Sequence, residues 1–171
     1  MTVKENKRTA NASVSGDLDS YDLKIIDALV NDGRLSIAEL SEKVGLSKTP
    51  CHQRLKRLLR EKYILGFRAV VNPQKLGLDH IAYTEVKLTD TREAALSAFN
   101  EAVRNIREIE ECHMIAGSYD YLLKVRTVNM RRFRRILGEY ISTLPHVAST
   151  STFVVMEPVK ETNLRAPSSL E

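Results

Sequence analysis

Tryptophan is absent from this sequence of 171 residues, and cysteine occurs only twice. Cys51 and Cys112 lie far apart in the sequence, and neither has a second cysteine nearby that could complete a metal-binding or redox pair. We therefore interpret both as small side chains of amphipathic segments.

Long apolar runs are also missing. No stretch approaches the roughly 20 continuous apolar residues that a membrane-spanning helix requires. The start of the chain, MTVKENKRTANASVSG, lacks the apolar core of a secretion signal. We expect a cytoplasmic protein that has no membrane partner.

The motifs of common catalytic sites are absent as well. The sequence has no Gly-rich phosphate loop and no nucleophile elbow, and its four histidines are scattered without ligand spacing. The run Glu110-Glu111-Cys112-His113 places ligand types side by side, but neighbours on a strand point to opposite faces and cannot converge on one ion. We expect no enzymatic activity, no catalytic residue, no metal and no resident cofactor.

The composition does contain an ample apolar fraction of 43% and a positive balance, with a net charge of +4 and a pI near 9.1. The apolar fraction is enough for a buried core in one large or two small domains. The positive charge is compatible with a polyanionic partner, and its distribution decides more than its total.

The first third of the chain has the pattern of three short helices. Asp19 is a good N-cap for a helix that stops at Asn31-Asp32-Gly33, and Ser36-Ile37-Ala38-Glu39 has the form of a capping box. Gly45 suits a left-handed turn, and Ser47 could cap a third helix that runs to about Lys62.

This third helix is strongly basic, with six basic residues and one acid between Leu46 and Lys62. A capped helix, a Gly turn and a basic helix are typical of a helix-turn-helix, whose second helix enters the major groove of DNA. The alternative is a three-helix bundle with a solvated basic face. The predicted DNA-binding residues are Ser47, Lys48, Thr49, Pro50, His52, Gln53, Arg54, Lys56 and Arg57. Of these, Ser47, Lys48 and Thr49 would anchor phosphates, while His52, Gln53 and Arg54 or Arg57 would reach base edges.

Residues 63–71 are β-prone, which suggests a small wing, and the remainder follows the order strand, helix, strand, strand, helix, strand. That order predicts an α+β fold in which a winged helix-turn-helix precedes a ferredoxin-like (βαββαβ) αβ-sandwich. The expected organisation is a flexible arm (1–16), a DNA-binding domain (17–72), a hinge (73–78), an αβ-sandwich for effector binding and oligomerisation (79–158) and a flexible tail (159–171).

Two surfaces of the predicted sandwich have no assigned role within one chain. One sheet face has no helices to cover it, and we expect it to carry apolar residues that a second subunit covers. The second predicted helix carries Arg131, Arg132, Arg134 and Arg135. This cluster could be a solvated face, or it could contact wrapped DNA or an acidic partner.

The turn Gly117-Ser118-Tyr119-Asp120 offers backbone N–H groups for a carboxylate, and its Asp120 offers a negative charge to an ammonium. That pair fits an amino acid, although the same residues also form ordinary turns.

Taken in order, several segments resemble the Lrp/AsnC (leucine-responsive and asparagine-responsive, "feast/famine") family of bacterial transcription regulators. The resemblance covers about residues 17–163. The segments are LDSYDLKII, DGRLSIAELSEKVGLSKTPCHQRLKRL, ECHMIAGSYDYLLKVR and LPHVASTSTFVVMEPVKET.

The resemblance implies homodimers built through the sheets, assembly to tetramers or octamers, and effector sites at contacts between dimers. It also implies that Asp120 faces the ammonium of the effector. Phe153 stands where close relatives often have tyrosine, so leucine, proline, another amino acid or no effector remain open. The effector-binding residues implied by motif position are Met114, Gly117, Ser118, Asp120, Met130, Phe153, Val154 and Val155.

We therefore predict a nucleoid-associated regulator of amino-acid metabolism genes, an activator or a repressor. It binds specific double-stranded DNA, and a small amino acid alters its assembly. The rivals are a metabolic enzyme or amino-acid-binding module with an incidental basic bundle, and a nonspecific chromosome-organising protein. A gel shift at moderate salt separates the first rival from the prediction. The preference for one site over random DNA separates the second.

Overall fold

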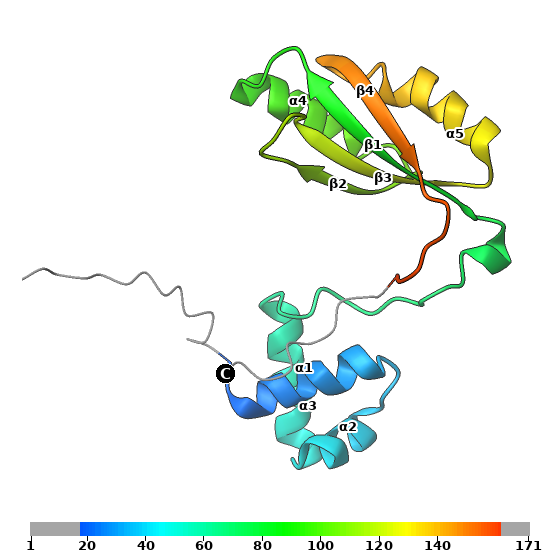
Figure 1. Cartoon of the computed structure of the whole chain (residues 1–171). Coiled ribbons are helices and arrows are strands. Elements are labelled where there is room, and N and C mark those ends of the chain that lie inside the picture. Colours follow the sequence, from blue (N-terminus) through cyan, green and yellow to red (C-terminus); the bar gives the residue numbers. More distant parts are fainter. Residues whose placement is uncertain (1–17, 162–171) are drawn as a thin grey trace, which may run out of the picture. The chain divides into compact units, whose positions relative to one another are not determined.

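A computed structural model describes residues 18–161, which form two compact units, one ending at Ala69 and one spanning Val70–Lys160 (Figure 1). The predicted flexible arm (1–16) lies outside the described residues, as does the tail beyond Glu161. Within residues 18–161, no helix is both long and apolar enough to cross a bilayer.

The first two helices begin where their caps predict. α1 spans Ser20–Asn31, and the Asp19 carboxylate accepts the N–H of Tyr21 at 2.9 Å and that of Asp22 at 3.0 Å. The Asp22 carboxylate accepts the Asp19 N–H in return, at 3.0 Å. α2 spans Ile37–Val44, and its capping box is confirmed because Ser36 and Glu39 cap each other's backbone N–H.

α3 spans Lys48–Arg60 and follows a turn at Gly45, whose φ of 75° is the predicted left-handed conformation. Ser47 occupies the predicted N-cap position, and the end at Arg60 lies two residues before the predicted end near Lys62. Ser47 has the extended backbone of an N-cap, but its side chain makes no capping hydrogen bond. The helix ends at Arg60 because Lys62 takes a left-handed φ of 66°.

The three helices share one apolar core. Its buried members come from all three helices, so the periodic apolar positions of the sequence meet as expected. They include Ile25, Ala28, Leu29, Leu40, Val44, Cys51 and Leu58.

The β-prone segment 63–71 forms no strand in the described structure. A strand needs a hydrogen-bonding neighbour, and no strand lies within residues 18–69 to provide one. Instead the segment carries exposed apolar side chains, including Leu65 and Val70, before a short 3₁₀ turn, Gln74–Leu76.

The second unit has the predicted βαββαβ order. Its antiparallel sheet has the strand order β2-β3-β1-β4, which confirms the ferredoxin-like sandwich. Figure 1 shows α4 and α5 on one side of this sheet. The elements are β1 (His80–Leu88), α4 (Glu93–Val103), β2 (Ile109–Met114), β3 (Tyr121–Thr127), α5 (Met130–Ile136), a π-helical turn (Leu137–Ile141) that continues α5, and β4 (Val147–Val154).

The helix-covered face of the sheet forms the core, and the other face is more ionic than predicted. Phe99 and Phe133 of the helices share a buried cluster with Val86, Tyr121 and Leu123 of the strands. The opposite face carries the side chains of Tyr83, Leu122 and Phe153 and also an ion-pair network. This network links Arg126 to Glu110 at 2.6 Å, Lys124 to Glu110 at 3.4 Å and to Glu111 at 3.6 Å.

Candidate nucleic-acid interface and effector site

α3 is divided lengthwise into a buried side and an exposed side. Cys51 and Leu58 are buried against the other two helices, and Leu55 is half-buried. Cα–Cβ bonds three or four residues apart project from the same helix face, so the residues between the leucines project elsewhere. The exposed members of the predicted DNA-binding set are Ser47, Lys48, Thr49, His52, Gln53 and Lys56, and Pro50 is half-buried beside them.

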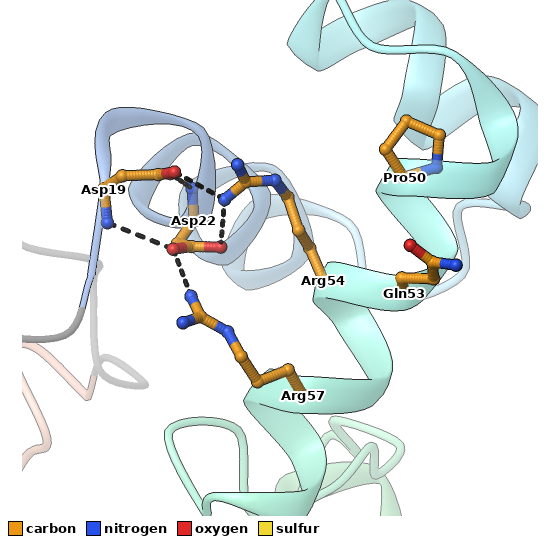
Figure 2. A pocket seen from close by; sticks show the side chains of 6 residues that line it. All are labelled: Asp19, Asp22, Pro50, Gln53, Arg54 and Arg57. Atoms are coloured by element: carbon orange, nitrogen blue, oxygen red, sulfur yellow. Dashed lines mark hydrogen bonds and ion pairs between the residues drawn. The ribbon is translucent and has the colours of Figure 1, made fainter.

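Arg54 and Arg57 do not share this exposure. Figure 2 shows both side chains reaching from α3 to Asp19 and Asp22 at the start of α1, while Gln53 takes no part in these ion pairs. Nη1 of Arg54 lies 2.6 Å from Asp19 Oδ2 and 2.9 Å from Asp22 Oδ1. Arg57 Nη2 donates to the other oxygen, Oδ2, of Asp22. The structure therefore places these two guanidinium groups against the start of α1.

Asp22 is the centre of this cluster. Its carboxylate has no solvent exposure and accepts hydrogen bonds from the Asp19 N–H, Arg54 and Arg57. A buried carboxylate is stable only when it is paired in this way. The Arg54 guanidinium also lies 5.7 Å from the centre of the Tyr21 ring, within the range of a cation–π contact.

The electrostatics of the cluster favour the charged forms of Asp19 and Arg54. The N–H of Asp22, followed by the guanidinium of Arg54, holds the pKa of Asp19 below its ordinary value, against the opposing effect of burial. The carboxylates of Asp19 and then Asp22 raise the pKa of Arg54. The cluster is thus a fixed ionic link between the first turn of α1 and the middle of α3.

Sequence reasoning missed Asp19 and Asp22 as residues of the interface. The signal was present, because Asp19 and Asp22 are three apart, as are Arg54 and Arg57, so each pair lies on one face of its helix. Which pairs meet is a matter of helix packing, which the sequence alone did not provide.

In the second unit, Asp120 ties the hairpin loop to β1. Its carboxylate accepts the N–H of Leu88 at 2.7 Å and Nζ of Lys87 at 3.2 Å. The Asp120 N–H donates to the Val86 carbonyl at 2.9 Å. The hydrogen bond from the Leu88 N–H is the main reason that the pKa of Asp120 is lowered, and the ion pair with Lys87 adds to it. The carboxylate therefore stays charged at neutral pH.

The predicted effector residues fall into two groups at opposite ends of the sheet. Met114 pairs with Tyr121, which pairs with Val86, so the hairpin loop with Gly117, Ser118 and Asp120 lies at the carboxyl end of β1. Val154 pairs with Ala82 at the other end, where Phe153, Val155 and Met130 also lie. Leu88 lies six positions after Ala82 along β1, a span of about 20 Å. A single chain does not bring the two groups together.

The comparisons with known proteins agree with this division into two units. Residues 18–64 match a family described as winged helix-turn-helix, DNA-binding, and residues 81–164 match the Lrp/AsnC ligand binding domain. A proline dehydrogenase transcriptional activator of Rhizobium radiobacter is 67% identical over 155 residues, which cover 91% of this chain and 99% of the relative. The leucine-responsive regulatory protein of Escherichia coli (strain K12) is 44% identical over 147 residues, covering 86% of this chain and 90% of that protein.

Solved structures give the same result. The crystal structure of an AsnC family transcriptional regulator from Agrobacterium tumefaciens superposes with a TM-score of 0.80 at 27% identity, covering 86% of this chain and 95% of that one. A transcriptional regulator from Neisseria meningitidis in complex with L-Met gives a TM-score of 0.78 at 30% identity, covering 85% and 94%.

A DNA-binding helix-turn-helix followed by a separate αβ ligand-binding domain defines a ligand-responsive transcription regulator, and not an enzyme. The chain belongs to the Lrp/AsnC family of these regulators, which confirms the family, the fold class and the regulatory function predicted from the sequence.

Proposed function

We propose that this protein activates transcription of a proline dehydrogenase gene in the bacterial cytoplasm and that proline is its effector. The observation that carries the proposal is the identity of 67% to the activator of Rhizobium radiobacter, which this chain matches over 99% of its length. A second activator of the same name, from Rhodobacter capsulatus, is 50% identical over 146 residues. An enzyme that consumes proline is useful when proline is abundant, so proline is a suitable signal for its activator.

The exposed side of α3 is the proposed DNA-reading surface. Ser47, Lys48 and Thr49 at its start would contact phosphate, where backbone N–H groups and a cation favour an anion. His52 and Gln53 would reach base edges, and Lys56 would contact the backbone further along. Pro50, half-buried between these positions, would fix the first turn of the helix.

In this proposal Arg54 and Arg57 are positioning residues and not base readers. Their guanidinium groups are held by Asp19 and Asp22, so reaching a base would require breaking an ion pair with a buried carboxylate. Their contribution to DNA binding is to fix the angle of α3 against α1. This role replaces the direct base contact that the sequence suggested.

The effector site is proposed to combine two subunits. One would supply the hairpin group, Met114, Gly117, Ser118 and Asp120, and another would supply Met130, Phe153, Val154 and Val155. Such a site exists only in an assembly, which fits homodimers that associate further to tetramers or octamers. The ammonium of proline would take the place of Lys87 Nζ, which lies 3.2 Å from the Asp120 carboxylate.

The proposal is tested with purified protein on duplex DNA from upstream of the proline dehydrogenase genes of its source, against random duplex as competitor. We expect a preference of about a thousandfold or more for the upstream DNA. We also expect proline to raise transcription from it with RNA polymerase, whereas leucine and methionine do not. A response to leucine alone would overturn the assignment of proline as the effector. Equal binding to random DNA would overturn the proposal that the protein activates a specific gene.

A further inference from the structure

The outer side of α5 carries three exposed arginines, Arg131, Arg134 and Arg135, which we call the α5 arginine surface. Among the residues that the structure describes, none of the three forms an ion pair or a hydrogen bond through its side chain. Arg132 differs, because it is half-buried and paired with Glu108. We propose that the α5 arginine surface is a second contact for the DNA backbone, distinct from α3.

The positive charge of this unit is concentrated at that place. Residues 70–160 contain 12 Lys and Arg and 11 Asp and Glu, and four of the 12 lie within residues 131–135. The remaining eight basic residues are outnumbered by the acids, so the unit outside α5 is acidic. A concentration of one sign on an otherwise opposite surface attracts a partner of the other sign to that spot.

The spacing of the arginines lowers the stability of the helix that carries them. Arg131 is followed by Arg134 and Arg135 at three and four positions, where like charges repel and lower helix stability. A bound polyanion converts this repulsion into attraction. The arrangement is therefore unfavourable in the free protein and favourable in a complex with an anion.

The shape of the surface suits an extended ligand more than a small one. The arginines line an open groove with Met130, Gly138 and Glu139. Nothing lies within 4 Å of the position that a Cβ on Gly138 would take, so a ligand can approach the backbone there. Glu139 is the one acid of this lining, and its charge opposes an anion at that end of the groove.

The phosphates of duplex DNA match these features. The arginine fork donates paired hydrogen bonds to phosphate oxygens, and a duplex presents phosphates at regular intervals along its length. The protein binds DNA through its helix-turn-helix unit, so duplex that flanks the bound site is present at high local concentration. The inference rests on that DNA binding and not on the identity of the gene or the effector.

The test compares Arg134→Gln/Arg135→Gln with the matched control Arg104→Gln/Arg107→Gln, which removes two exposed charges elsewhere in the same unit. Binding is measured between about 50 and 200 mM salt on a duplex of about 20 base pairs that holds only the α3 site, and on one of about 100 base pairs. On the long duplex we expect Arg134→Gln/Arg135→Gln, the α5 variant, to lose affinity and to lower the slope of log K against log salt by about 2 for each bound subunit. Its binding to the short duplex should equal that of the wild type.

Two further variants give the sign of the effect. Arg134→Lys/Arg135→Lys keeps the charges and should retain most of the slope, and Glu139→Gln should tighten binding to the long duplex. Equal slopes for the α5 variant and its control on the long duplex would overturn the proposal, as would losses of equal size on both duplexes. Unchanged DNA binding with a loss of transcription by RNA polymerase would assign the surface to an acidic protein partner and would also overturn it. Failure of specific binding by the wild type on the short duplex would instead count against the proposed function.

Discussion

The carboxylate of Asp22 accepts a hydrogen bond from Nη1 of Arg54 at 2.9 Å, across 32 positions of sequence and with no solvent exposure of the Asp22 side chain. Asp22 also caps α1, because it accepts the Asp19 N–H. One carboxylate thus fixes the start of the first helix and the orientation of the third. In the proposed function, DNA reading by α3 depends on this orientation, so the residues of the link would affect function without touching DNA.

Loss of the Asp22 carboxylate should lower stability. We expect Asp22→Ala to reduce the free energy of unfolding by about 1–3 kcal/mol, since a helix cap is lost and two guanidinium groups lose their buried partner. Both arginines are less than a third exposed in the ion pairs but can turn to water, which limits the loss. Urea unfolding measures it. Asp27→Ala, at an exposed position of the same helix, is the control, and an equal effect in both would contradict the link.

The role of Arg54 can be separated from that of Lys56 by salt dependence. Lys56→Gln removes a proposed phosphate contact from each subunit, so the slope of log K against log salt should fall by about 0.9 for each bound subunit. Arg54→Gln should weaken binding by shifting α3 but leave the slope unchanged. Fluorescence anisotropy on one operator duplex measures both variants. A slope that falls by the same amount for Arg54→Gln would show that this arginine contacts DNA.

The turn before α3 gives a matched pair of backbone predictions. Gly45 has φ 75°, and nothing lies within 4 Å of an added Cβ, so Gly45→Ala should lower the free energy of unfolding by about 1–2 kcal/mol through backbone strain alone. Lys62 adopts a left-handed φ of 66° although it carries a Cβ, which disfavours this conformation. Lys62→Gly should therefore stabilise the unit by up to about 1 kcal/mol. Thermal unfolding of both variants measures these shifts, and effects of the same sign would contradict the explanation.

Acid should weaken the link at the start of α1. Because the pKa of Asp19 is lower in the folded protein than its ordinary value of 3.8, its stabilising contribution is complete above that value. The contribution disappears as the pH falls through the folded pKa. Asp19→Asn keeps an N-cap acceptor but does not titrate, so its stability should depend less on pH below about pH 4. Thermal midpoints measured down to about pH 2 test this, and parallel pH profiles for the two proteins would refute it.

The two-subunit effector site can be tested by mixing variants. Asp120→Asn removes the charge from the hairpin group but keeps an acceptor for the Leu88 N–H, and Met130→Asp places a repelling carboxylate in the other group. Each variant alone should fail to bind proline by calorimetry. If each site combines two chains, subunits exchanged in equal amounts should regain about a quarter of the sites. No recovery in exchanged mixtures would place the whole site within one chain.

Much of the fold could be predicted from local signals. Asp19, Ser36 and Glu39 act within one helical turn, so their caps were readable from sequence, and the alternation of Tyr121, Leu123 and Val125 predicted the sheet core. The segment 63–71 forms no strand because strand formation needs a partner as well as β-prone residues.

The candidate sites were less predictable because their geometry is tertiary. The direction of the Arg54 side chain depends on how α3 packs against α1, which helical spacing does not determine. The separation of Met114 from Val154 depends on strand order and register, which place them at opposite ends of β1. Motif position alone assigned these residues to one effector site, although within one chain they lie far apart.

In the proposed function, the exposed side of α3 reads a specific DNA sequence. The most direct test is the ratio of affinities for the operator and for random duplex, measured in the same buffer for the wild type and for Gln53→Ala. We predict a wild-type ratio of about a thousand or more that falls by about tenfold to a hundredfold in the variant, with binding to random duplex unchanged. A ratio that Gln53→Ala and the corresponding His52→Ala variant both leave unaltered would contradict the claim.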